Sequence, residues 1–173
     1  MLATIRQATL ADAKIATEIS MRNFAESFGA SYPPADLADF LSQNYSLERH
    51  QEWLANSQYA LFLLEFEGAL LGHALVGPCG LPHADVTTAD GELKRLYVLK
   101  QAQGKNLGNK LLKTALNWLE KDTPRTLWLG VWSENYGGQK LYRRHGFERA
   151  GQYYFHVGKS ADFEFIFKRA PSR

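Results

Sequence analysis

The sequence predicts a mixed α/β fold with one central, mostly antiparallel sheet of about seven strands and flanking helices. Two observations predict this class. Short runs rich in leucine, valine and aromatic residues are separated by turn residues, which is typical of antiparallel strands. A strand, an amphipathic helix and a second strand also follow one another within residues 92–132, and this order favours a right-handed parallel crossover.

The N-terminal half is expected to form one strand, three helical segments and a hairpin. In chain order these are a strand at 4–9, helices at 9–29, within 31–46 and at 47–57, and strands at 59–66 and 69–77. Thr9 is a candidate N-cap and Gly29 a stop signal, and the Pro33-Pro34 pair interrupts the helical pattern before it restarts. Glu67-Gly68 is the expected hairpin turn.

The C-terminal half begins with a loop rich in turn residues at 77–91. The elements expected after it are a strand at 92–100, a helix at 109–122, a strand at 125–132, a short helix at 137–146 and a hairpin of 147–158 with 161–169. Five apolar residues of the longer helix share one face, namely Leu111, Leu112, Ala115, Leu116 and Leu119. This spacing is typical of a helix that covers a sheet.

Length and composition indicate a globular chain. With 173 residues, 45% of them hydrophobic and 22% charged, we expect a single domain over 1–173 with a substantial core. No signal peptide is visible, and Glu65 and Glu67 interrupt the longest apolar stretch, so we expect no membrane association and a cytoplasmic location. Cys79 is the only cysteine, which excludes an internal disulfide and a cysteine zinc cluster, and no metal is expected.

Charge is distributed unevenly along the chain, although the net charge is only +2. Residues 1–93 hold 12 acidic and 4 basic residues, whereas residues 94–173 hold 6 acidic and 16 basic ones. The asymmetry favours an anion bound by the basic half and a cation by the acidic half. Two solvated surfaces would give the same pattern. The basic half carries no recognised nucleic-acid-reading motif, so no nucleic-acid partner is expected.

The segment Gln103-Gly104-Lys105-Asn106-Leu107-Gly108 stands between an expected strand and an expected helix. Helix N-termini present free N–H groups and a partial positive charge, and therefore bind phosphates. Glycine lets the backbone approach an anion closely. The segment is neither a Walker loop nor a GxGxxG motif. A glycine-containing helix start alone also fits an ordinary turn.

A second motif, NYGGQKLYRRHGF from Asn135 to Phe147, follows about thirty residues later. The two motifs together resemble those of the GNAT superfamily of N-acetyltransferases, Gln/Arg-x-x-Gly-x-Gly/Ala and Asn-x-x-Ala-x-x-Leu/Phe-Tyr-x-x-x-Gly-Phe. The opening TIRQATLADAKIATEI also looks like the usual start of that superfamily. Two departures are visible, since Asn106 replaces the middle glycine and Gly138 stands where alanine is usual.

The resemblance implies a GNAT fold, in which the parallel strands at 92–100 and 125–132 splay apart, and acetyl-CoA as co-substrate. The implied cofactor-binding residues are Leu96, Tyr97 and Val98 on the strand, Gln103, Gly104, Lys105, Asn106, Leu107, Gly108 and Asn109 at the loop, and Asn135. Tyr142 occupies the position of the superfamily's general acid, and Glu92 that of the glutamate that serves as base in several relatives. Packing is the alternative for Tyr142 and a solvated strand end for Glu92.

Several stretches, among them LWLGVW, FHVG and ADFEFIF, look like those of bacterial spermine/spermidine acetyltransferases of the PaiA type. That resemblance implies transfer of acetyl to a primary amine, with a polyamine as acceptor. It is also compatible with a homodimer. Glu18, Glu26, Asp36 and Asp39 are candidate acceptor contacts in the acidic half. Another small amine, a protein amine and a non-catalytic acyl-CoA-binding module are the alternatives that the sequence leaves open.

Overall fold

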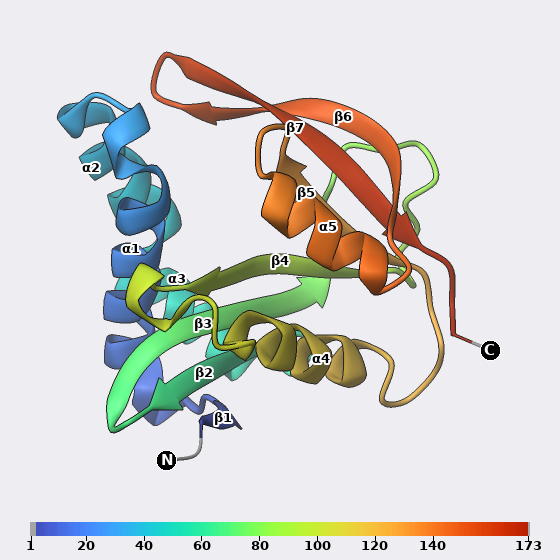
Figure 1. The fold of residues 1–173 in the computed structure, drawn as a ribbon, viewed down its shortest axis with the longest axis horizontal. Coiled ribbons are helices and arrows are strands. Elements are labelled where there is room, and N and C mark those ends of the chain that lie inside the picture. Colours follow the sequence, from blue (N-terminus) through green and yellow to red (C-terminus); the bar gives the residue numbers. More distant parts are fainter. Residues whose placement is uncertain (1–2, 173) are drawn as a thin grey trace.

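The computed structural model describes residues 3–172. Its fold is a seven-stranded sheet with helices on both faces (Figure 1). The strands are β1 (Thr4–Gln7), β2 (Ala60–Phe66), β3 (Ala69–Pro78), β4 (Gly91–Val98), β5 (Leu127–Trp132), β6 (Glu148–Val157) and β7 (Ser160–Arg169). The α-helices are α1 (Ala13–Phe28), α2 (Pro34–Asn44), α3 (Leu47–Ala55), α4 (Leu107–Leu119) and α5 (Tyr136–Arg144). Single 3-10 turns lie at Leu10–Asp12, Gly29–Ser31 and Lys100–Ala102.

The strands follow the order β1-β2-β3-β4-β5-β7-β6, and every neighbouring pair is antiparallel except β4 and β5. The predicted fold class is therefore confirmed. The parallel pair is short, because only Gly91 pairs with Leu127 and Glu92 with Trp128 before the strands diverge. The remainder of β4 pairs with β3 alone, so its other edge is free.

Local sequence explains the turns and the start of α4. Glu67 and Gly68 both have positive φ, 54° and 77°, which matches the tight hairpin predicted there. Helix α4 begins at Leu107, two residues earlier than predicted, because Asn106 takes the left-handed conformation (φ 59°) that ends the loop. The predicted apolar face of α4 is buried, with Leu111, Leu112, Ala115, Leu116 and Leu119 all at most 4% exposed.

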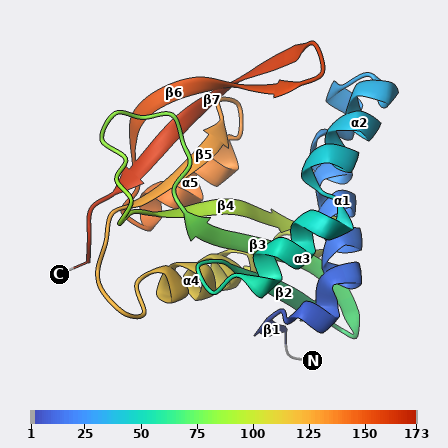
Figure 2. The same cartoon turned by 180° about the vertical axis from the view of Figure 1, so that it is seen from behind.

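Helices α3 and α4 cover opposite faces of the sheet, since α4 lies in front in Figure 1 and α3 in front after a half turn in Figure 2. Helix α1 packs with α3 and against β3. At this contact His73 is fully buried and its Nδ1 lies 2.7 Å from Oδ1 of Asn23. His73 is therefore a core residue that connects β3 with α1.

A second apolar cluster connects the N-terminal helices with the tip of the β6–β7 hairpin. Its buried members are Phe24, Tyr32, Tyr45 and Val157. The ring of Phe24 lies 5.0 Å from that of Phe40 on α2, and Phe40 lies 5.5 Å from Phe155 on β6. The cluster holds α1 and α2 beside the open side of the β4–β5 pair, where it forms one wall of the candidate site.

None of the helices within residues 3–172 is long and apolar enough to cross a membrane. Over the same residues, no group of three or more His, Cys, Asp or Glu side chains is placed to hold a metal ion. Cys79 is a partly buried free thiol, and burial raises its pKa to about 11, so the reactive thiolate is scarce at neutral pH. The domain extent of 1–173 stays a prediction.

Candidate active site

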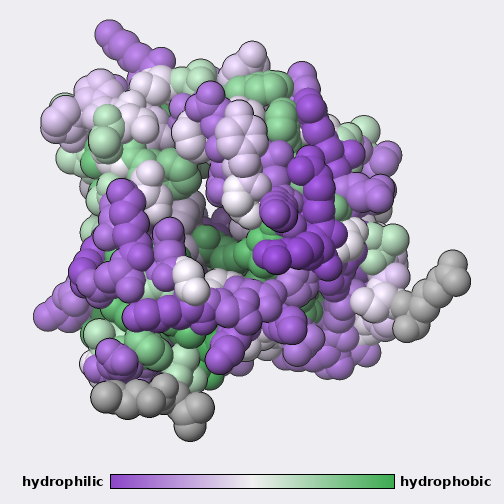
Figure 3. All heavy atoms as spheres, in the orientation of Figure 1, coloured by the Kyte–Doolittle hydropathy of each residue, from purple (hydrophilic) through white to green (hydrophobic). Residues whose placement is uncertain are grey.

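The divergence of β4 and β5 opens a groove between the two halves of the sheet. Its lining residues are Ser27, Phe28, Leu96, Tyr97, Val98, Lys100, Gln103, Trp132, Glu134 and Asn135. On the side of the molecule seen in Figure 3, a hollow lies near the middle, with hydrophobic atoms at its floor and hydrophilic atoms around it. A free strand edge offers N–H and C=O groups to an extended ligand. The groove can therefore take a ligand that pairs with β4 as an additional strand would.

The loop before α4 has a backbone suited to an anion. Gly104 and Asn106 both take positive φ, 79° and 59°, so Asn106 supplies the conformation that the missing glycine would have given. The first N–H bonded within α4 is that of Lys110, to the Asn106 carbonyl at 3.2 Å. The preceding amides of Leu107, Gly108 and Asn109 lie at the helix N-terminus, where backbone donors have no partner within the helix.

A second groove surrounds these amides. It is lined by Val98, Ala102, Gln103, Gly104, Asn106, Leu107, Gly108, Asn109, Gly137, Leu141 and Arg144. Gly137, Leu141 and Arg144 come from α5 and were not predicted from the sequence as part of the site. A Cβ on Gly108 would lie no closer than 3.9 Å to any other group, the nearest being Val98 Cγ2. The space beside this amide is therefore open, and the donor set fits a diphosphate.

Three polar residues of the loop and of the first turn of α4 have specific contacts. Gln103 Nε2 donates to the Val98 carbonyl at 3.1 Å, and Asn109 Oδ1 lies 2.6 Å from His145 Nε2. These two contacts fasten the loop to β4 and to the end of α5. The ammonium of Lys105 lies 4.8 Å from the centroid of the Phe66 ring, and Lys105 does not line the groove. The part that its charge takes in anion binding stays a prediction.

Asn135 caps α5 and also lines the groove between β4 and β5. Its Oδ1 accepts a hydrogen bond from the Gly138 amide at 2.9 Å. A Cβ on Gly138 would lie 2.6 Å from Asn135 Nδ2, whereas a Cβ on Gly137 would have no neighbour within 4 Å. The glycine at 138 thus makes room for the capping side chain.

This difference predicts opposite effects for two neighbouring substitutions. Gly137→Ala is expected to raise the free energy of unfolding by about 0.5 kcal/mol, because alanine restricts the unfolded chain. Gly138→Ala is expected to lower it by about 1 kcal/mol, because the methyl group displaces the Asn135 cap. Urea denaturation of the two variants measures the difference. Equal effects on stability would contradict the assigned role of the cap.

Tyr142 lies on the buried side of α5, with 8% of its surface exposed, and its ring packs edge-on against Phe147 at 6.3 Å. Burial raises the pKa of its hydroxyl above the usual range, and the nearby charge of Glu164 raises it further. The hydroxyl is therefore protonated at neutral pH. This is the state that a proton donor needs.

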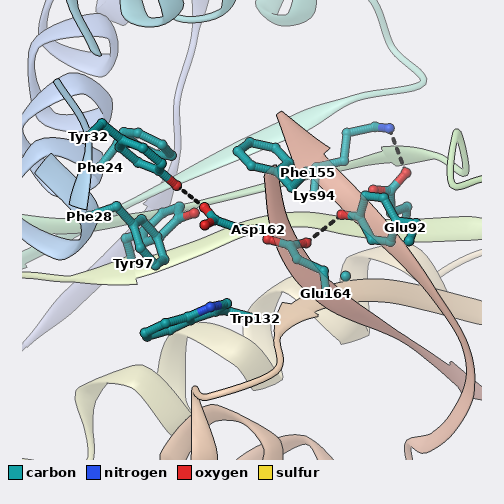
Figure 4. Close-up of a pocket in the computed structure, with 12 residues that line it drawn as sticks. Phe24, Phe28, Tyr32, Glu92, Lys94, Tyr97, Trp132, Phe155, Asp162 and Glu164 are labelled. Atoms are coloured by element: carbon teal, nitrogen blue, oxygen red, sulfur yellow. Dashed lines mark hydrogen bonds and ion pairs between the residues drawn. The ribbon is translucent and has the colours of Figure 1, made fainter. Parts of the chain in front are cut away.

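A third cavity, here called the chamber, continues from the groove between β4 and β5. It is lined by Phe24, Phe28, Tyr32, Glu92, Lys94, Tyr97, Gly130, Trp132, Tyr153, Phe155, Asp162 and Glu164. Phe28, Tyr97 and Trp132 line both spaces, so the chamber and the groove meet there. Figure 4 shows Asp162 and Glu164 extending from β7 toward the space between the aromatic rings.

Each carboxylate in the chamber has a different partner. Oε2 of Glu92 lies 2.8 Å from the Lys94 ammonium and accepts the Gly80 amide at 2.9 Å. The Tyr32 hydroxyl donates to Asp162, and the Tyr153 hydroxyl donates to Glu164 at 2.5 Å. Lys94 is the one lysine or arginine among the lining residues, against three carboxylates. The chamber therefore combines aromatic faces with excess negative charge, and both features attract ammonium groups.

None of the four acidic residues predicted in the N-terminal half lines the chamber itself, and only Asp36 and Asp39 line a neighbouring groove. Glu26 accepts the Lys100 amide at 2.9 Å and so fastens α1 to the end of β4. Asp36 and Asp39 line an outer groove that shares Tyr153 and Phe155 with the chamber. Glu18 is an exposed residue of α1.

The chain has detectable relatives over most of its length. The family profile described as acetyltransferase (GNAT) family matches residues 21–147. An uncharacterized N-acetyltransferase in the pepI 3′ region of Lactobacillus delbrueckii subsp. lactis is 26% identical over 152 residues, which cover 88% of each chain. A spermine/spermidine N(1)-acetyltransferase of Bacillus subtilis is 32% identical over 99 residues, covering 56% of this chain and 64% of that one.

Solved structures have the same fold. The PaiA N-acetyltransferase of Thermoplasma acidophilum, in complex with coenzyme A, has a TM-score of 0.76 at 20% identity over 98% of this chain and 99% of that one. The ribosomal-protein-S18-alanine N-acetyltransferase of Escherichia coli has a TM-score of 0.67 at 23% identity over 99% and 96%. The names of the Bacillus subtilis relative and of the Escherichia coli structure state different acceptors, so similarity to these proteins does not identify the acceptor of this chain.

A splayed parallel strand pair, with a glycine-containing loop at the start of the helix that connects its strands, is typical of one class of acyltransferases, and the profile match specifies the family. The chain belongs to the acetyltransferase (GNAT) family and is an N-acetyltransferase. The resemblance stated from the two sequence motifs is thereby confirmed.

Proposed function

We propose that this enzyme transfers acetyl from acetyl-CoA directly to a primary amine of a polyamine such as spermidine or spermine. The observation that supports the acceptor is the chamber, where three carboxylates and several aromatic rings meet the groove that runs along β4. An extended polycation gains from negative charge and from aromatic faces along its length. The partial similarity to a spermine/spermidine acetyltransferase supports the same acceptor class.

The groove between β4 and β5 and the second groove beside the start of α4 are together proposed to hold acetyl-CoA. Amides of 103–109 would bind its diphosphate, with Arg144 as an added cation, and the free edge of β4 at 96–98 would pair with the pantetheine arm. Asn135 would contact the arm from the start of α5. Bound acetyl-CoA supplies the thioester carbonyl that the amine attacks, so that a C–N bond forms as the C–S bond breaks. No metal is needed for this chemistry.

Tyr142 and Glu92 are proposed to take part in the reaction, Tyr142 at the leaving group and Glu92 on the side of the acceptor amine. Tyr142 donates a proton on the leaving-group side, which its raised pKa allows at neutral pH. Glu92, predicted from the sequence as base, lies in the chamber, and its carboxylate contributes to the negative charge that the acceptor meets. An acceptor amine with a pKa near that of lysine, about 10.4, is mostly protonated at pH 7. A proton acceptor beside it is therefore required.

A panel of acceptors tests this function. CoA release from acetyl-CoA is measured with spermidine, spermine, amino acids, aminoglycosides and a lysine peptide. We expect the highest kcat/KM with the polyamines. Preference for the peptide would instead indicate a protein acceptor. Tight CoA binding without turnover of any amine would indicate an acceptor outside the panel or a non-catalytic acyl-CoA-binding module, and would contradict the polyamine proposal.

A further inference from the structure

We propose that Glu164, with Tyr153 as its hydrogen-bond partner, accepts the proton that the acceptor ammonium loses before it attacks. This inference rests on the proposed function, because it assigns one step of that reaction to a residue of the chamber. It concerns a side chain of β7, a strand that sequence reasoning did not connect with proton transfer.

Strand register brings Glu164 to the junction of the chamber and the groove. In the sheet, Glu164 pairs with Trp132 of β5 on one side and with Tyr153 of β6 on the other. Trp132 lines the groove as well as the chamber, so the carboxylate stands where an amine in the chamber would face a ligand in the groove. Figure 4 shows Glu164 above Trp132 and beside Asp162.

Gly130 gives the pair its space. A Cβ on Gly130 would lie 2.5 Å from the Tyr153 hydroxyl and 3.1 Å from Glu164 Oε2. Any other residue at 130 would push the hydroxyl and the carboxylate away from β5. The strand therefore carries a glycine where the Tyr153–Glu164 pair lies across it.

Glu164 differs from Glu92 in its charge environment. Glu92 is paired with the Lys94 ammonium, whereas Glu164 has no salt-bridge partner among residues 3–172. Burial raises the pKa of Glu164, the hydrogen bond from Tyr153 lowers it, and the charge of Asp162 raises it again. A buried carboxylate without a cation is well suited to receive a proton from an adjacent ammonium.

The titratable groups around Glu164 lie on its own strand, β7, and on four other parts of the chain. They are Tyr153 on β6, Asp162 on its own strand, Tyr32 and Tyr45 beside α2, the Glu92–Lys94 pair and Tyr97 on β4, and Tyr142 on α5. The charge of Glu164 raises the pKa of Tyr142, so the proposed acceptor and donor of protons lie within electrostatic range of each other. Lys94 is the one cation in this set, and it is bound to Glu92.

The step balances as a single proton transfer. An N–H bond of the ammonium breaks and an O–H bond forms on Glu164, which leaves a neutral amine with a free electron pair and a neutral carboxyl group. The carboxyl group then releases its proton to solvent, and the charged form of Glu164 is restored. Activity should consequently fall as pH falls through the pKa of Glu164.

Glu164→Gln tests the assignment, with Glu92→Gln as the matched variant. For the best polyamine of the panel, Glu164→Gln is expected to lower kcat by about 100-fold. It should also move the break of the acidic limb of kcat/KM from the pKa of Glu164 up toward that of the amine, because only the free amine then reacts. Tyr153→Phe is expected to retain activity but to move that break to higher pH, since the lost hydrogen bond had stabilised the charged carboxylate. Glu92→Gln should keep the break in place.

Folding of the Gln variant is checked independently of turnover. Burial raises the pKa of Glu164 in the folded protein. The charged carboxylate therefore lowers the free energy of unfolding at pH values above that pKa, and this loss is absent well below it. The Tm of Glu164→Gln should therefore equal or exceed that of the wild type at pH 8. A break of the acidic limb that stays at its wild-type pH in Glu164→Gln, or that moves toward the pKa of the amine in Glu92→Gln, would overturn the assignment while leaving the proposed function intact. A wild-type enzyme that acetylates no cationic amine would overturn both.

Discussion

Tyr142→Phe is expected to lower kcat by about 10²- to 10⁴-fold, the range that general acid–base catalysis contributes. The phenyl ring keeps its packing against Phe147, so only the proton donor is lost. The Kd for acetyl-CoA, measured by calorimetry, should stay within about threefold of the wild-type value. Burial raises the pKa of Tyr142 above its usual range. We therefore expect no loss of activity from deprotonation of Tyr142 between pH 7 and 9.

Tyr136 provides the control for this substitution. It lies on the same helix but is 73% exposed, so Tyr136→Phe removes a hydroxyl without touching the buried side of α5. The Tyr136 variant should turn over at the wild-type rate. If Tyr142→Phe also kept its full kcat, the leaving group would not take its proton from Tyr142.

Gly108→Glu is expected to weaken acetyl-CoA binding by at least about 100-fold. The new carboxylate would lie beside the amides at the start of α4, where the diphosphate is proposed to bind, and would repel it. The fold should persist, because a Cβ has room there and an acidic side chain in the first turn favours a helix. Gly108→Pro should weaken binding by roughly 10-fold or more, since it removes one N–H donor but is tolerated at a helix start.

Asn117→Glu is the matched control, because it adds the same charge to the exposed side of α4 near the other end of the helix. Its acetyl-CoA Kd should change by less than about twofold at moderate salt. Wild-type affinity in Gly108→Glu, with Tm unchanged, would mean that the diphosphate binds elsewhere.

Much of the fold and the cofactor side was predictable because it depends on local sequence. Leucine spacing located α4, Glu67-Gly68 located a hairpin, and the segment 103–108 located the loop that leads into α4. Asn106 is a local case of the same kind, since asparagine tolerates positive φ better than most residues and the structure gives φ 59°.

The acceptor side was less predictable because it depends on how distant strands pair. Asp162 and Glu164 alternate with phenylalanine on β7, which is a signal for one acidic face of a strand, but nothing local says that this face lines a cavity. The chamber takes these two carboxylates from the basic half of the chain. Whole-half charge counts therefore could not locate them.

Glu92 shows the same limit. Its strand pairs irregularly with β3, because the register shifts between Leu75 and Val76, close to the Glu92–Lys94 pair. A bulge of this kind cannot be read from one sequence. Homodimer formation and a cytoplasmic location likewise stay predictions.

The central claim is that the chamber selects a multiply charged amine. It is tested most directly by comparing kcat/KM for spermidine with that for an alkylamine of similar length and a single charge. The account predicts at least a 10-fold advantage for spermidine, reduced at high salt because the chamber's carboxylates recognise the added charges. Equal values for the two amines would contradict it.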